Sequence, residues 1–270
     1  MAIPIVLISL LLLVFLYILS TITRRNHPGL KALANHAYAH RGLHGDGVPE
    51  NSLEAFRLAK ENGYGVELDV QLLKDGNLAI FHDADLERMT GKPGKILDLA
   101  ADQLQEYALE NTGQTIPLFS DILNLFAGQV PVIVEIKSCK DYPQLCDKVC
   151  KMLDGYEGLY CLESFDPRCV RWLKKNRPEL IRGQLSENYL KATKAKIPWI
   201  LKFLLTFQML NFLTKPDFVA YKCSDRKHLS NVITRGIWKT QGVTWTVASQ
   251  AEFDDVKKEN WIPIFEGFRP

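Results

Sequence analysis

The amino-acid sequence predicts a protein of the α/β class: a TIM (β/α)8 barrel preceded by one N-terminal transmembrane helix. The chain has 270 residues, which is close to the roughly 250 residues of a typical barrel of this kind. Eight short segments rich in β-forming residues alternate with segments of helical pattern, as expected of parallel βα units. A hydrophobic content of 47% is compatible with one large core.

The first segment, Ala2–Thr23, contains no charged residue. It has about the length that a helix needs to cross a bilayer, roughly 20 residues, whereas a cleaved signal peptide should begin with positive charge. Arg24 and Arg25 follow it directly, so the positive-inside rule places the rest of the chain in the cytoplasm. The expected organisation is an anchor over 1–24, a linker over 25–36 and the barrel domain over 37–270.

Eight segments after the anchor have the composition and length of buried strands. Each is followed within a few residues by a candidate helix start, so the carboxyl ends of the strands and the helix starts share one face. The expected strands are Tyr38–Gly42, Gly65–Val70, Val132–Lys137, Leu159–Phe165, Ile181–Ser186, Phe218–Cys223, Val243–Val247 and Ile262–Glu266.

Four of the helix starts are marked by capping residues. Asn51 with Glu54 resembles a capping box and predicts a helix over Ser52–Asn62, which Gly63 would end. The other expected starts are Asp166-Pro167, Ser224, and Ser249 with Glu252.

One stretch interrupts the alternation. The turn at Lys74–Asn77 leaves no room for a crossover helix, so the chain from Glu67 to Asp83 is expected to form a hairpin that brings His82 beside Asp69. Residues 83–117 then form a long excursion, with a helix expected at 101–109, and an excursion of this length usually covers a site.

A second apolar stretch, Ile197–Leu213, has apolar positions almost all around a helix, interrupted by Lys202. A buried helix of the barrel is the plainest interpretation. A membrane-dipping lip with Trp199 and Phe203 at the interface and a second span are the alternatives, although a second span would disturb the strand count.

Charge and cysteine content exclude some classes of protein. Thirty-three basic and 31 acidic residues give a net charge of +2, so nothing points to nucleic acid as a partner. The six cysteines contain no CxxC pair, and a domain of this size does not need disulfides, so free thiols in a reducing compartment are expected.

Carboxylates gather at the predicted carboxyl ends of two strands. Glu67 and Asp69 are two residues apart and so point to the same side of a strand, and Glu135 ends the next barrel strand. Three carboxylates in a partly buried cavity would repel one another without a cation, and ligands that are all oxygen favour Mg²⁺ or Ca²⁺. Rim salt bridges to Arg41 and Lys137 are the alternative.

Two histidines are expected at the same rim, His40 on the first strand and His82 on the returning hairpin. Such a pair suits acid–base catalysis, in which one histidine removes a proton from a nucleophile and the other protonates a leaving alkoxide. Arg41 and Lys137 add positive charge where a phosphodiester would develop negative charge.

At this point the sequence resembles the glycerophosphodiester phosphodiesterase family over nearly everything after the expected anchor. No single motif is specific for this family, but the whole set of motifs, in this order along the chain, is specific. The motifs are HRG (His40–Gly42), PEN (Pro49–Asn51), ELDVQLLKDG (Glu67–Gly76), FHD (Phe81–Asp83), EIK (Glu135–Lys137), ESF (Glu163–Phe165) and TWTV (Thr244–Val247).

The resemblance implies a TIM-barrel hydrolase that converts glycerophosphodiesters to glycerol 3-phosphate and an alcohol with a divalent metal. It implies two catalytic histidines, three metal ligands, phosphate contacts, a substrate wall and two residues near the metal. The implied catalytic histidines are His40 and His82, and the implied metal ligands are Glu67, Asp69 and Glu135. Arg41 and Lys137 would contact the phosphate, and Trp245 would form part of the substrate wall. Glu50 and Asn51 would lie near the metal.

The chain departs from the family pattern in two places. Glu266 stands where many members have the aspartate of a Thr-Asp pair, and Ala248 stands where an asparagine is usual. Two other functions remain open: a lysophospholipase D that acts on lysophospholipids at the membrane, and a catalytically silent membrane-tethered binding domain. In this interpretation His44 and Asp46 are ordinary loop residues.

Overall fold

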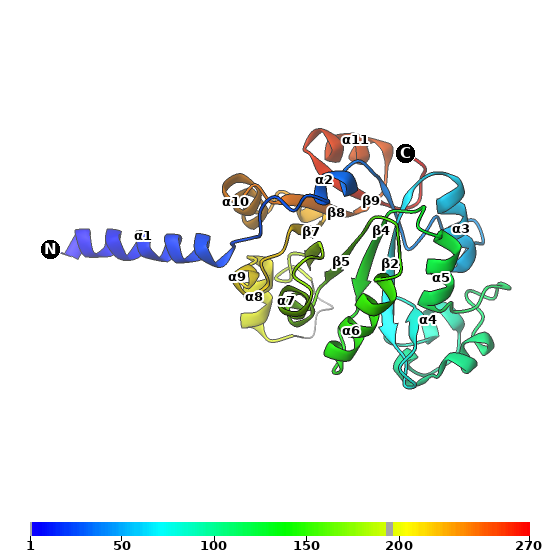
Figure 1. Ribbon diagram of the computed structural model, residues 1–270. Coiled ribbons are helices and arrows are strands. Elements are labelled where there is room, and N and C mark those ends of the chain that lie inside the picture. Colours follow the sequence, from blue (N-terminus) through cyan, green and yellow to red (C-terminus); the bar gives the residue numbers. More distant parts are fainter. Residues whose placement is uncertain (1, 193–196) are drawn as a thin grey trace.

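A computed structural model describes residues 2–192 and 197–270, and it contains a closed parallel barrel surrounded by helices (Figure 1). The barrel closes because β1 pairs in parallel with both β2 and β9. Its eight strands are β1 (Tyr38–His40), β2 (Gly65–Leu72), β4 (Val132–Ile136), β5 (Tyr160–Ser164), β6 (Arg182–Ser186), β7 (Phe218–Lys222), β8 (Gln241–Val247) and β9 (Trp261–Phe265). The expected barrel is therefore confirmed, and each expected strand is present with its ends shifted by at most two residues.

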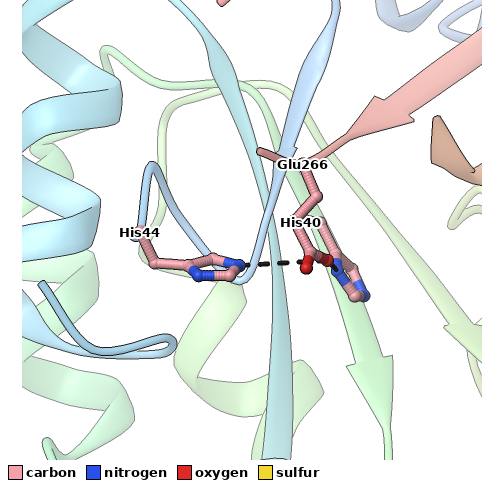
Figure 2. Close-up of side chains that lie close together, drawn as sticks. All are labelled: His40, His44 and Glu266. Atoms are coloured by element: carbon pink, nitrogen blue, oxygen red, sulfur yellow. Dashed lines mark hydrogen bonds and ion pairs between the residues drawn. The ribbon is translucent and has the colours of Figure 1, made fainter. Parts of the chain in front are cut away.

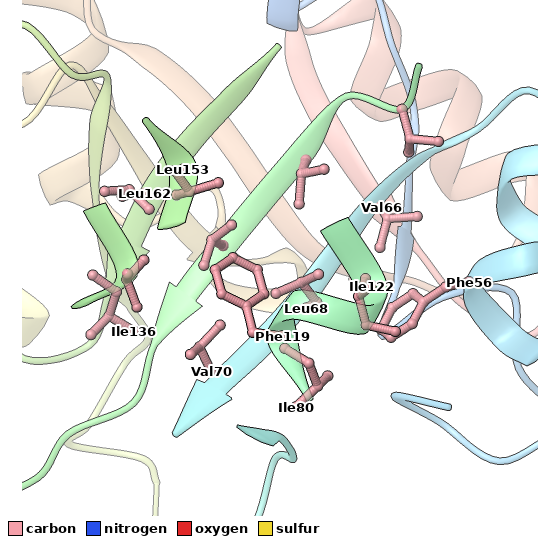
Figure 3. Packing of buried hydrophobic residues seen from close by; sticks show 14 of the residues in the cluster. Phe56, Val66, Leu68, Val70, Ile80, Phe119, Ile122, Ile136, Leu153 and Leu162 are labelled. Carbon is pink, nitrogen blue, oxygen red and sulfur yellow. The ribbon is translucent and has the colours of Figure 1, made fainter. Parts of the chain in front are cut away.

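The helices pack on the outside of this barrel (Figure 1). Alternate strand residues face them, and Figure 3 shows Val66 and Leu68 of β2 beside Phe119 and Ile122. Burial of this apolar layer stabilises the fold. The helices after the N-terminal segment are α2 (Leu30–Leu33), α3 (Leu53–Glu61), α4 (Glu87–Thr90), α5 (Phe119–Phe126), α6 (Tyr142–Leu153), α7 (Pro167–Asn176), α8 (Trp199–Thr206), α9 (Asn211–Thr214), α10 (Leu229–Ile237) and α11 (Gln250–Lys258).

Two of the four expected helix starts are confirmed. The side chains of Asp166 and Ser249 accept hydrogen bonds from backbone N–H groups in the first turns of α7 and α11. The helix expected over Ser52–Asn62 is present as α3, but its expected capping residue is wrong, as is the helix start expected at Ser224. Ser52 rather than Asn51 caps α3, because the Asn51 side chain has a buried acceptor elsewhere, and α10 starts after His228 because Ser224 lies in a short 3-10 turn.

The expected hairpin is confirmed. β3 (Leu78–Ile80) runs antiparallel to β2 with Val70 opposite Ile80, and the backbone N–H of Phe81 donates to the carbonyl of Asp69. The excursion that follows has a small apolar core of its own. It contains α4 and two 3-10 helices, and the second of these (Ala101–Glu106) replaces the longer helix expected at 101–109.

The N-terminal helix α1 (Ala2–Ser20) projects away from the barrel (Figure 1). Within the described ranges, no helix combines the length and apolarity needed to cross a bilayer. The structure therefore does not confirm a transmembrane helix at 1–24.

The segment after α1 is fixed to the barrel by polar contacts. Arg24 forms an ion pair with Asp217, just before β7, and the Arg25 guanidinium lies 5.4 Å from the ring centre of Trp238. The Thr23 and Thr240 hydroxyls are 2.7 Å apart and buried. The arginines that predict membrane orientation thus also hold the N-terminal segment against the barrel.

The stretch Ile197–Leu213 contains two short helices, α8 and α9, in place of one continuous helix. Part of it is buried, but the exposed fractions of Trp199 and Ile200 are 68% and 57%. It is therefore neither a fully buried barrel helix nor a second span. The six cysteines are free, as expected, and all but Cys139 are buried.

Candidate active site

Three carboxylates converge at the carboxyl ends of β2 and β4. Glu67, Asp69 and Glu135 are all buried, and one oxygen of each lies within 4.8 Å of the others. The parallel register places Asp69 directly opposite Glu135, and Glu67 is on the same side of β2 as Asp69. The strand geometry expected from the sequence therefore produces the expected cluster, which could hold a metal ion.

Two cations partly compensate the negative charge of the carboxylate cluster. The Lys137 Nζ lies 2.8 Å from Glu135 and 3.1 Å from Asp69, and the Arg41 Nε lies 3.5 Å from Asp69. Burial alone would lower the pKa of Lys137, but Asp69 and Glu135 hold it above its ordinary value. Burial, and then the charges of Asp69 and Glu135, raise the pKa of Glu67 well above its ordinary value. Without a further cation, the cluster therefore favours the protonated form of Glu67.

The residues of the PEN motif lie around the cluster in different ways. The Asn51 amide donates to Asp69 at 2.8 Å, and its backbone φ of 54° is left-handed. Glu50 accepts hydrogen bonds from Arg41 at 2.7 Å and from Arg88 at 2.6 Å. Glu50 therefore reaches the carboxylate cluster only through Arg41, and Arg88 connects the 83–117 excursion to the same place.

His40 lies between two carboxylates. Its Nε2 is 3.9 Å from Glu67, and its Nδ1 is 2.5 Å from Glu266, which directly follows β9. The hydrogen bond to His40, with burial opposing it, lowers the pKa of Glu266 to about 2. Figure 2 shows His44 pointing at the same carboxylate, and its Nε2 is 3.9 Å from Glu266. Sequence analysis missed both contacts, although barrel closure between β1 and β9 could have indicated them.

His82 is held at the end of the hairpin. Its Nδ1 contacts Asp83 at 2.6 Å, and the Gln71 amide donates to the carbonyls on either side, Phe81 and Asp83. Burial lowers the pKa of His82, and the charge of Asp69 only partly opposes this effect. The contact with Asp83 leaves Nε2 as the nitrogen available for proton transfer.

Two further side chains complete the mouth of the barrel. Trp245 of β8 packs edge-on against Phe165 with ring centres 5.4 Å apart. Glu163 of β5 lies opposite Glu135 in register and is buried, and its Oε2 has no hydrogen-bond partner among the described residues. Burial and then Glu135 raise its pKa well above the ordinary value. Its place near the end of a strand is the signal that could have marked Glu163 as a site residue.

Comparison with known proteins identifies this constellation. The sequence model of the glycerophosphoryl diester phosphodiesterase family matches residues 40–264. The chain belongs to this family. The resemblance carried by the HRG, ELDVQLLKDG and EIK motifs is thereby confirmed, and the chain is a phosphoric diester hydrolase.

Curated members of the family include bacterial and mammalian proteins. A glycerophosphodiester phosphodiesterase of Bacillus altitudinis is 30% identical over 223 residues, which cover 74% of this chain and 91% of that protein. Glycerophosphodiester phosphodiesterase 1 of Rattus norvegicus is 28% identical over 247 residues, covering 78% of this chain and 71% of the rat protein.

Solved structures of family members share the fold. An Oleispira antarctica phosphodiesterase in complex with the product sn-glycerol-3-phosphate aligns with a TM-score of 0.68 and 22% identity over 86% of this chain and 92% of that one. The glycerophosphodiester phosphodiesterase of Thermotoga maritima aligns with a TM-score of 0.65 and 24% identity over 85% and 93%.

Proposed function

We propose that the protein hydrolyses glycerophosphodiesters to glycerol 3-phosphate and an alcohol, with a divalent metal and two histidines. The observation that carries the proposal is the buried cluster of Glu67, Asp69 and Glu135, with His40 against one side and His82 near the other. An intact set of this kind argues against a catalytically silent binding domain.

The residues fit a divalent cation. Without a cation, burial and mutual repulsion raise the pKa values of Glu67 and Glu163, so a bound cation would favour the ionised form of these buried carboxylates. The donors nearest the centre of the cluster are all oxygen, as Mg²⁺ or Ca²⁺ requires. Glu67, Asp69 and Glu135 would hold the ion, and when bound it would supply positive charge that polarises the phosphodiester.

The chain's own residues account for the proton transfers. One histidine takes the proton of the glycerol hydroxyl next to the phosphate, and that oxygen attacks phosphorus while the bond to the alcohol breaks. The other histidine gives its proton to the departing alcohol oxygen. Water then opens the cyclic phosphate. Arg41 and Lys137 contact the phosphate oxygens where negative charge develops, Asn51 fixes Asp69, and Trp245 forms part of the substrate wall.

A lysophospholipase D is the second candidate, and a specific observation favours it. The large apolar side chains of α1 between Ile5 and Leu16, together with Trp199 and Ile200, are exposed, which suits a protein that meets its substrate at a lipid surface. The same residues would serve both reactions, because the two substrates differ only in the acyl chain that a lysophospholipid carries on its glycerol.

One comparison distinguishes these activities. Purified full-length protein is given glycerophosphocholine or lysophosphatidylcholine, with Mg²⁺ or with Ca²⁺, and released choline is measured. Choline from the first substrate, lost on addition of EDTA, supports the proposed function; preference for the second supports the lysophospholipase. Full activity after chelation would refute the metal assignment.

We also propose that α1 attaches the protein to a membrane, with the barrel on the cytoplasmic side. Support comes from the uncharged sequence of the helix and its exposed apolar surface. Fractionation of cells that express the full chain, compared with a variant that starts at Thr21 and so keeps the contacts of Thr23 and Arg24, tests attachment. Recovery of both forms in the supernatant contradicts it, and protease accessibility of the barrel in sealed vesicles tests the orientation.

A further inference from the structure

A second group of possible metal ligands lies at the seam of the barrel, outside the carboxylate cluster. His40 comes from the end of β1, His44 from the loop after it, and Glu266 from the end of β9 (Figure 2). One donor atom of each lies within 4.8 Å of the others. We call these three residues the seam triad, and we propose that the seam triad binds a transition metal such as Zn²⁺, which inhibits the enzyme.

The seam triad has a different chemistry from the carboxylate cluster. Two imidazole nitrogens and one carboxylate oxygen form a donor set that suits Zn²⁺, whereas Mg²⁺ and Ca²⁺ prefer oxygen alone. Three protein ligands leave the fourth tetrahedral position for water. The Glu266 side chain is 39% exposed, so an ion has access from solvent.

The donor distances lie on either side of the value for a tetrahedral site. Bonds of about 2.0–2.1 Å place neighbouring donors about 3.4 Å apart. The Glu266 oxygen is 3.9 Å from His44 Nε2 and 2.5 Å from His40 Nδ1. A movement of the Glu266 carboxylate away from His40 and towards His44 would bring both distances nearer to that value.

A second observation also indicates a ligand at this place. The Nε2 atom of His44 is buried and has no hydrogen-bond partner among the described residues, although the ring points at Glu266. Buried polar atoms are normally satisfied, so one without a partner calls for an explanation. A metal ion between Nε2 and the carboxylate would supply the missing partner.

Occupation of the seam triad would stop proton transfer by His40. A neutral imidazole has one nitrogen with a free lone pair and one that carries hydrogen. If the Nδ1 lone pair binds the metal, the hydrogen resides on Nε2, the nitrogen that faces Glu67. That nitrogen can then no longer accept a proton from substrate, and the imidazolium that would act as the acid cannot form while the metal occupies Nδ1. This consequence rests on the proposed function, whereas metal binding itself does not.

Binding is tested with Co²⁺, whose visible absorption reports tetrahedral nitrogen and oxygen ligands. Full-length protein in excess Mg²⁺ is titrated with Co²⁺ and then with Zn²⁺, in parallel with His44→Ala, His44→Gln and the control Asp46→Asn, an exposed position in the same loop. We expect a band in the unmodified protein and the control, its displacement by Zn²⁺, and its loss in both His44 variants. The same spectrum in the His44 variants overturns the site.

Inhibition is tested separately on glycerophosphocholine, with each variant normalised to its own rate without zinc. We expect the Zn²⁺ concentration for half-inhibition to rise at least about tenfold in His44→Ala and to stay the same in Asp46→Asn. Equal sensitivity, or inhibition relieved by additional Mg²⁺, would instead place the inhibitory zinc in the carboxylate cluster. If no hydrolysis is measurable the proposed function fails, and the Co²⁺ titration still decides whether the seam triad binds metal.

Discussion

Binding of Mg²⁺ or Ca²⁺ to the carboxylate cluster should stabilise the folded protein by an amount that depends on the ion concentration relative to Kd. Glu67, Asp69 and Glu135 are buried within 4.8 Å of one another, and a divalent ion among them would offset their mutual repulsion. A ligand at 100 times its Kd stabilises by about 2.7 kcal/mol. For a domain of this size about 1 kcal/mol changes Tm by roughly 2–4 °C, so the expected rise is about 5–11 °C.

The assay is thermal unfolding after EDTA treatment, with Mg²⁺ or Ca²⁺ then added in steps. Asp69→Asn should lose most of the rise, because the variant removes one negative ligand from the centre of the cluster. Asp121→Asn, at an exposed position on α5, is the matched control and should keep the full rise. A Tm that is independent of both ions, or an equal rise in Asp69→Asn, would refute the assignment of the cluster.

Five further outcomes are expected. His82→Ala should reduce diester hydrolysis by about 10²–10⁴-fold while keeping the metal-induced rise in Tm, and undiminished turnover would contradict its role. Because the pKa of Glu67 is raised above its ordinary value of 4.5, the metal-free protein should gain stability as pH falls from the raised pKa towards 4.5, and urea unfolding in EDTA checks the sign. Ser52→Ala should cost about 1 kcal/mol in urea unfolding through loss of the α3 cap. Gly183→Ala should cost about 1–3 kcal/mol, since its Cβ would lie 2.1 Å from the Phe218 ring, whereas Gly236→Ala in α10, with open space around it, should gain about 0.5–1 kcal/mol.

The elements that sequence analysis predicted well are those whose signal is local. The barrel strands are short segments rich in β-forming residues, and the two-residue spacing of Glu67 and Asp69 determines that they share a side. The turn at Lys74–Asn77 likewise determined the hairpin. Such features depend on a few neighbouring residues and therefore do not depend on contacts with distant parts of the chain.

The errors arose where a distant residue decides between equivalent local choices. Asn51 and Ser52 are both good capping residues, and only the buried acceptor on Asp69 draws Asn51 away from the helix. Glu266 looked like a departure from the family pattern, and its contact with His40 depends on strands at opposite ends of the chain. No local pattern contains that information.

The seam between β1 and β9 also affects the order in which the site is completed during synthesis. Glu67, Asp69 and Glu135 all belong to the first half of the chain, whereas His40 and its partner Glu266 are separated by 226 positions. On the ribosome, the carboxylate cluster can therefore gather before the partner of His40 has been made. A nascent chain that has not yet emerged through β9 would contain the carboxylates for the metal but lack the group that holds its first histidine.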